Sequence, residues 1–147
     1  MQDFVHLHVH TQYSLLDGQA SVARLVDKAM KNGMKGIAVT DHGNMFGIKE
    51  FTNYVNKKNS GPKGEVKDLK KRIAGIEAGT IECEDKEAEI AACKAKIVEA
   101  ENKLFKPVIG CEMYVARRTM DLKEGKPDQS GYHLIVLAKN EKGYHNL

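Results

Sequence analysis

The sequence lacks the features that mark membrane, secreted and disulfide-stabilised proteins. No stretch approaches the roughly 20 consecutive apolar residues that a membrane-spanning helix needs. Residues 1–6 contain no basic segment followed by an apolar one, so we expect no signal peptide. The only cysteines are Cys83, Cys93 and Cys111, with no Cys-x-x-Cys pair among them. This pattern is typical of reduced thiols in a cytoplasmic protein.

A strong charge bias is also missing. The 23 basic and 20 acidic side chains give a net charge of +3, which neither indicates nor excludes a nucleic-acid partner. The 147 residues are 41% hydrophobic and 29% charged, as in one globular domain with its own core.

Histidine is unevenly distributed, because three of the six histidines fall in the first ten residues. Residues 3–11 alternate in a period of two, which predicts a strand. One face would carry Phe4, His6, His8 and His10, and the other Val5, Leu7 and Val9. The apolar face is expected to pack against helices, and the histidine face to line a site.

A β/α pattern follows this segment. Apolar residues at helical spacing predict a helix over 21–32, with Ser21 as N-cap and Gly33 after its end. A short buried strand is predicted over 36–41, and a second helix over about 46–57. Such β-α-β units build parallel sheets.

Residues 65–104 differ in character from the rest of the chain. They hold ten acidic and eight basic side chains, no histidine and no recognisable motif. Apolar residues three, four or seven apart predict two amphipathic helices in an antiparallel hairpin that turns at Gly79-Thr80. We interpret the segment as a solvated spacer and assign it no chemistry.

The α/β pattern resumes after the hairpin, with strands predicted over 107–116 and 132–138 and a polar loop over 117–131. Asn140 could cap a last helix. Arg117, Arg118 and Lys123 lie in the loop, where they could approach DNA or simply face solvent. The count is thus four strands, expected to be parallel.

Metal-ligating side chains cluster at the expected strand ends. The first strand ends in His8 and His10, the second is followed by His42, and the third carries Glu112. Ligands of parallel α/β folds bind where the carboxyl ends of the strands converge. Imidazole and carboxylate groups are the usual ligands of zinc, manganese and iron, and Asp17 could add a carboxylate from the adjacent loop.

Less specific interpretations apply to some of these residues. The three N-terminal histidines could be polar groups of a half-exposed strand, although stacked imidazoles without a cation are costly. His6 lies deeper in the strand and could contact the other two without binding metal. His133 begins its strand, so geometry leaves its role open, and His145 is expected at the surface. Cys111 should face away from Glu112, into the core.

Several motifs together resemble the PHP (polymerase and histidinol phosphatase) family. They are His6-Leu7-His8-Val9-His10-Thr11, Asp17-Gly18, Thr40-Asp41-His42-Gly43-Asn44-Met45-Phe46-Gly47, Lys106-Pro107-Val108-Ile109-Gly110-Cys111-Glu112-Met113-Tyr114-Val115 and Lys142-Gly143-Tyr144-His145-Asn146-Leu147. They are most similar to the branch at the N-terminus of the alpha subunit of bacterial replicative DNA polymerases. The resemblance covers residues 2–58 and 106–147.

The resemblance implies an α/β fold, the N-terminal part of a distorted (β/α)7 barrel of parallel strands. Residues 1–147 would then be a PHP domain with a charged helical insertion at about 62–105. It also implies a site for up to three divalent metals, Zn or Mn, with Fe and Mg as further candidates. The implied ligands are His8, His10, Asp17, His42, Glu112 and His133, with Glu112 bridging two metals.

Three functions are compatible with this family. The first is a metal-dependent phosphoesterase of the 3′–5′ exonuclease type, within a DNA-directed DNA polymerase (nucleotidyltransferase) whose partner is DNA. The second is a metal-stabilised structural module that docks the proofreading exonuclease and other replicase subunits. The third is a stand-alone phosphatase of the histidinol-phosphate type. The magnesium-binding aspartates of a polymerase are not among these residues, so we expect the chain alone to be inactive.

Overall fold

The computed structural model describes residues 4–147, which divide into two compact units. The first, the sheet unit, comprises residues 4–54 together with Lys106–Leu147, and the second, the hairpin unit, comprises Val55–Phe105. The helix α2 (Ile48–Lys58) spans the boundary between them. None of the described helices is both long and apolar enough to cross a membrane.

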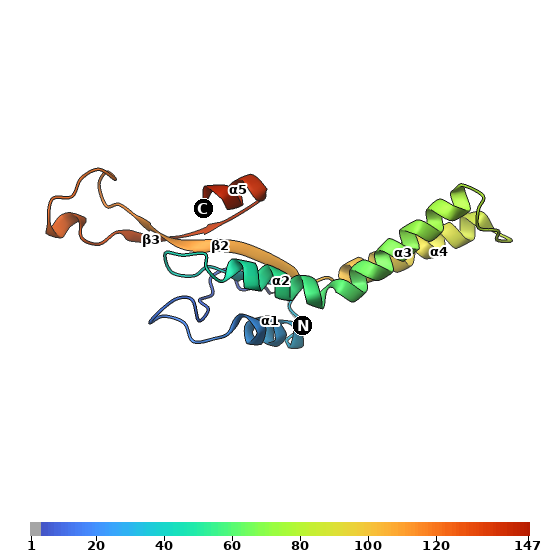
Figure 1. Ribbon diagram of the computed structural model, residues 1–147, viewed down its shortest axis with the longest axis horizontal. Helices are drawn as coiled ribbons and strands as arrows, with labels where there is room; N and C mark the ends of the chain where they lie inside the picture. Colours follow the sequence, from blue (N-terminus) through green and yellow to red (C-terminus); the bar gives the residue numbers. More distant parts are fainter. Residues whose placement is uncertain (1–3) are drawn as a thin grey trace. The chain divides into compact units, whose positions relative to one another are not determined.

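The sheet unit is built on three strands in the order β1 (Gly36–Val39), β2 (Lys106–Val115) and β3 (Tyr132–Leu137). The strands β1 and β2 run parallel, with Gly36 opposite Lys106. Figure 1 shows β2 and β3 as neighbouring strands, and their register is antiparallel. The fold is therefore mixed α/β with a small parallel and antiparallel sheet.

The prediction of an all-parallel sheet is wrong for β3. A parallel neighbour would need a crossover, usually through a helix packed on the sheet. The connection from β2 to β3 contains only the single 3₁₀ turn η1 (Lys126–Asp128). It is closed by Arg118, whose guanidinium binds the carboxylates of Glu124 and Asp128. This loop turns the chain straight back along β2. The two carboxylates neutralise Arg118, a side chain that could otherwise approach DNA.

The predicted first strand, residues 3–11, is also wrong in the part that the structure describes; Asp3 lies outside the described residues. The segment is extended and accepts two backbone hydrogen bonds from β1 and the residue that follows it: Ala38 N donates to His6 O (2.8 Å) and Thr40 N donates to Val9 O (2.9 Å). The two acceptors are therefore three residues apart in this segment, whereas their donors are only two residues apart. This mismatch interrupts the ladder, and Leu7 stays half exposed rather than packing under helices.

Helices complete the sheet unit near the positions predicted. The helix α1 (Val22–Lys31) follows Ser21 and ends before Gly33, whose φ of +76° suits glycine. Its Val22, Val26 and Ala29 are buried. The short helix α5 (Glu141–Asn146) is capped by Asn140, whose side chain accepts from Gly143 N at 2.9 Å. All four residues of β1 are buried, so the core of this unit lies around β1.

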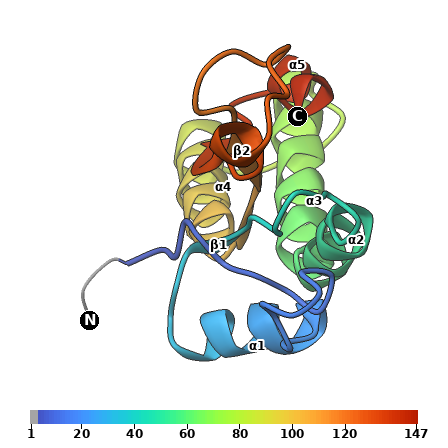
Figure 2. The same ribbon diagram turned by 90° about the vertical axis from the view of Figure 1, so that its left-hand side faces the viewer.

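The hairpin unit consists of α3 (Ser60–Glu77) and α4 (Lys86–Asn102), which lie side by side in both views (Figures 1 and 2). The predicted turn is confirmed, since Gly79 adopts a φ of +73°. Asp85 caps α4 by accepting from Ala88 N at 2.9 Å. The seam buries Ile76, Cys93, Ile97 and Ala100, and all three cysteines of the chain are free thiols.

Asn59 fastens the two ends of the hairpin unit together. Its amide donates to Phe105 O at 2.8 Å and its carbonyl accepts from Phe105 N at 2.9 Å, and the side chain is buried. We expect Asn59→Ala to lower the free energy of unfolding by about 2 kcal/mol, because it leaves two buried backbone groups unsatisfied. Denaturant unfolding measures this change.

The matched control is Asn56→Ala, since Asn56 is exposed and accepts a single hydrogen bond from Lys63. Its expected effect is within about 0.5 kcal/mol. Equal destabilisation by the two substitutions would show that the Asn59 bonds do not hold the ends of the hairpin.

Candidate metal centre

Glu112 on β2 is the centre of the site. Its backbone is fixed to the segment that follows β1, because Glu112 N donates to Asp41 O at 3.1 Å and Gly43 N donates to Glu112 O at 2.8 Å. The residue is only 6% exposed. A carboxylate in such a place needs partners, and the imidazoles of the N-terminal segment and of β3 supply them.

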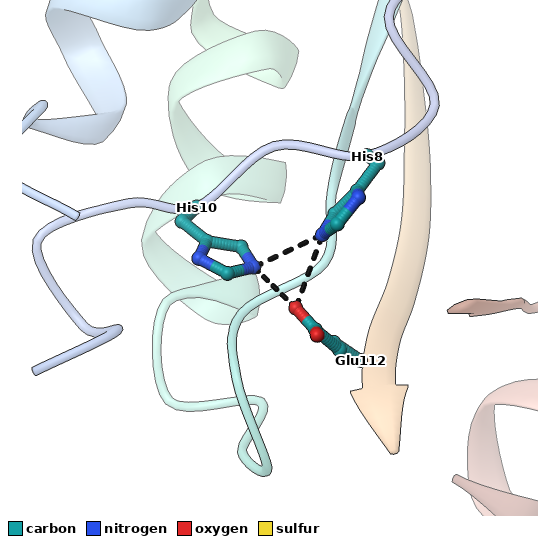
Figure 3. Close-up of side chains that lie close together, drawn as sticks. All are labelled: His8, His10 and Glu112. Carbon is teal, nitrogen blue, oxygen red and sulfur yellow. Dashed lines mark hydrogen bonds and ion pairs between the residues drawn. The ribbon is translucent and has the colours of Figure 1, made fainter. Parts of the chain in front are cut away.

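His8 and His10 form the first group with Glu112 (Figure 3). Their Nε2 atoms lie 3.0 Å and 2.5 Å from the Oε2 atom of Glu112, and 3.1 Å from each other. Figure 3 shows both rings directed toward the carboxylate from the N-terminal segment. Three donor atoms therefore converge on one point.

His42 and His133 form the second group, also with Glu112. The Nδ1 atom of His133 lies 2.6 Å from Oε1 of Glu112, the other oxygen of the same carboxylate. The rings of His42 and His133 lie 4.7 Å apart. One buried carboxylate thus takes part in two groups, with Oε2 directed to His8 and His10 and Oε1 directed to His133.

Asp17 belongs to neither group of three but contacts the second through His42. Its Oδ2 atom lies 2.8 Å from His42 Nδ1. The other ring nitrogen of His42 contacts the hydroxyl of Tyr114. Asp17 is therefore placed either to orient the imidazole or to add a donor beside it.

His133 reaches the site because β3 is antiparallel. His133 lies opposite Tyr114 near the carboxyl end of β2. The beginning of β3 therefore lies beside the end of β2. This is why His133, near the start of its strand, lies close to Glu112, near the end of β2. Geometry from the sequence left this residue undecided because it assumed a parallel strand.

Buried Asp41 holds the loops that carry the other histidines. Its carboxylate accepts from Thr11 N (2.6 Å), Thr11 Oγ1 (2.8 Å) and Ser14 Oγ (2.7 Å), and Asp41 is 1% exposed. Ser14 Oγ in turn accepts from His42 N at 3.0 Å. One side chain thus fixes the loop after His10 against the start of the loop that carries His42.

The electrostatics favour an ionised Glu112. Burial raises the pKa of its carboxyl group, but the hydrogen bonds from His8, His10 and His133 outweigh burial and lower the pKa to about 2. At neutral pH the group is a carboxylate, which is the form that binds metal.

The donor set fits a divalent metal. Bonds of 2.0–2.2 Å to a tetrahedral metal separate neighbouring donor atoms by roughly 3.4 Å. The first group has separations of 2.5–3.1 Å, so small outward movements would admit an ion. Imidazole with carboxylate suits zinc, manganese or iron.

The structure also shows where the other residues considered in the sequence analysis lie. His6 stays outside both groups, and its ring contacts Phe4 at 4.7 Å. Cys111 is buried, as expected, and His145 is exposed. The sequence placed Asp41 beside His42 at a strand end without giving it a role, and Tyr114 was not singled out. The signal for Asp41 was a carboxylate directly after a buried strand, and Tyr114 shared the strand face of Glu112.

Comparisons with known proteins agree with this site. The sequence profile of the PHP domain family matches residues 6–97 and 87–147. The DNA polymerase III subunit alpha of Treponema pallidum is 39% identical over 145 residues, which are 98% of this chain and 8% of that protein. The corresponding protein of Borreliella burgdorferi is 40% identical over 147 residues, 98% of this chain and 9% of that protein. That of Aquifex aeolicus is 32% identical over 152 residues, 99% of this chain and 9% of that protein.

The chain therefore spans less than a tenth of the length of these relatives. The Treponema pallidum alignment has 145 positions over 98% of the chain, so it runs through the hairpin unit as well as the sheet unit. Since the family profile matches both segments of the sheet unit, the chain belongs to the PHP domain family.

Proposed function

We propose that the chain is the N-terminal PHP domain of a DNA polymerase III alpha subunit and serves DNA replication in the cytoplasm. The similarity to three such subunits along 98–99% of this chain supports this proposal. The sheet unit would be the first part of the (β/α)7 barrel, and α3 and α4 the insertion at about 62–105. The polymerase reaction would belong to the whole protein, with DNA as its partner.

The activity that the geometry supports best is metal-dependent hydrolysis of a phosphodiester at a DNA 3′ end. The observation that carries this proposal is the single buried carboxylate of Glu112 shared by two groups of imidazole donors. His8, His10, Glu112, His42 and His133 would hold the ions, and Asp17 would orient His42 or add a donor. Zn or Mn fits these donors best, with Fe and Mg as further candidates and up to three ions in the complete domain.

Bound metals would supply an activated water and charge stabilisation at the phosphoryl oxygens. The protein's own residues supply the arrangement. Glu112 holds the imidazoles of His8, His10 and His133, and Asp41 holds the two loops on which His10 and His42 depend. The contact of Asp17 Oδ2 with His42 Nδ1 would set the orientation of that ring.

The test is release of the 3′-terminal nucleotide from a single-stranded oligonucleotide by the full-length protein with Mn²⁺. The double variant His8→Ala/His10→Ala is expected to lose at least about 100-fold in rate, while polymerase activity in the same preparation reports intact folding. Equal nuclease rates in the two proteins would contradict a catalytic role for the site.

A structural role is the second candidate. The segment that carries His8 and His10 accepts two backbone hydrogen bonds from residues 38–40, so metals at Glu112 would cross-link it further to the sheet. The domain could then dock a separate proofreading exonuclease subunit. In this case the wild-type protein shows no nuclease activity, and the double variant loses thermal stability and binding of that subunit. A stand-alone phosphatase ranks lower, since the relatives described above are polymerase subunits.

A further inference from the structure

An open cavity of about 560 Å³ lies beside the second metal group. His42 and Asp17 form part of its wall, so the cavity is continuous with the candidate metal centre. Ligand sites of small molecules commonly have volumes of 300–1,000 Å³. Space for a nucleotide-sized group therefore adjoins the place where the phosphodiester is proposed to bind.

The remaining walls of the cavity are mostly apolar and aromatic. Two loops line it, one with Leu15 and Leu16 and the other with Phe46. These side chains are 84%, 105% and 77% exposed, which is unusual for three large apolar groups around one cavity. Tyr13 and Tyr114 add aromatic surface.

The two loops are held in place, so the cavity is formed before any ligand binds. Ser14 O accepts from Asp17 N (3.0 Å) and Gly18 N (2.9 Å), which closes the first loop on itself. The amide of Asn44 donates to Tyr13 O at 3.0 Å and joins the second loop to the first. Leu16 has a φ of +78°, and it is the one residue other than glycine with positive φ among residues 4–147. Its side chain is thereby directed outward at the cost of strain.

The charge of the walls indicates which part of a ligand they suit. Among the described residues no lysine or arginine lines the cavity, and Asp17 adds a carboxylate. A phosphate is therefore disfavoured inside it, whereas a flat neutral group is favoured by the tyrosine and phenylalanine rings. A terminal nucleotide matches this division, because its phosphodiester is charged and its base is neutral and aromatic.

We propose that the cavity lined by Leu15, Leu16, Phe46, Tyr13 and Tyr114 holds the unpaired base of the terminal nucleotide whose phosphodiester lies at the metal centre. The inference rests on the proposed function and adds how its substrate is held. Stacking and apolar contact accept any of the four bases, so the cavity favours a frayed or single-stranded end without strong base preference.

The test is the equilibrium binding of this chain to a single-stranded oligonucleotide that carries 2-aminopurine at its 3′ end. Stacking of the 2-aminopurine base quenches its fluorescence, and this quenching is the signal that is measured. Phe46→Ala is expected to weaken binding by about tenfold and to reduce the quenching, because base–aromatic stacking is lost. Phe46→Tyr keeps a ring and should restore both. Met120→Ala is the matched control, since Met120 is 88% exposed and outside the cavity.

Unchanged binding and quenching in Phe46→Ala would overturn the inference, as would a wild-type chain that does not quench the probe. This assay measures no hydrolysis and is therefore distinct from the nuclease test. Quenching without nuclease activity would contradict the proposed reaction and leave the base site supported. Nuclease activity with no effect of Phe46→Ala on quenching would support the proposed reaction and contradict the base site.

Discussion

Glu112→Gln is expected to remove metal from both groups of the candidate centre at once. The side chain offers Oε2 to His8 and His10 and Oε1 to His133. Replacing the carboxylate with a neutral amide of the same shape takes away the charge that each site shares. We expect the affinity for Zn²⁺ or Mn²⁺ to fall by at least about 100-fold, beyond the usual cost of losing an outer-shell partner. Elemental analysis after dialysis and calorimetric titration measure the loss.

Single histidine variants make this prediction sharper. His8→Ala removes a donor from the first group only, so part of the bound metal should remain. Glu141→Gln is the matched control, because Glu141 is an exposed glutamate that belongs to neither group. Metal retained by Glu112→Gln at the wild-type level would contradict the shared-carboxylate arrangement.

Asp41→Ala is expected to be the most destabilising single substitution in the sheet unit. It removes three hydrogen bonds and leaves the backbone N–H of Thr11 and the hydroxyl groups of Thr11 and Ser14 without their acceptor. The side chain is fully buried, so water does not replace it. We expect a loss of about 3 kcal/mol or more in the free energy of unfolding.

Denaturant unfolding of the metal-free chain separates this effect from metal binding. The matched control is Asp121→Ala, an aspartate exposed in the loop between β2 and β3, with an expected change within about 0.5 kcal/mol. The Asp41 variant should also bind metal more weakly, since the loops that carry His10 and His42 are no longer joined. A free energy of unfolding within about 0.5 kcal/mol of the wild-type value would show that the Asp41 bonds do not stabilise the sheet unit.

The sequence predicted the helices well because their signals are local. Periodic apolar residues, a glycine of positive φ after α1 and another between α3 and α4 are all readable within a few residues of the chain. Strand direction is not a local property. The antiparallel pairing of β3 depends on the path of the loop from Arg117 to Gly131, which neither alternation nor composition describes.

The candidate metal ligands were predictable by residue type but not by arrangement. Histidine and acidic side chains at strand ends pointed to four of the five residues that the structure gathers into two groups, and the resemblance to the PHP family added His133. The sequence already set His6 apart from His8 and His10, but the irregular pairing of the N-terminal segment with residues 38–40 was not predictable. The role of Asp41 depends on bonds to Thr11 and Ser14, about 30 residues earlier in the chain.

The central claim is that two metal positions share the carboxylate of Glu112. Anomalous diffraction from crystals grown with Mn²⁺ or Zn²⁺ tests it most directly. We expect two peaks, one between His8, His10 and Glu112 and one between Glu112, His42 and His133. Peaks elsewhere on the protein, or none near Glu112 at saturating metal, would contradict it.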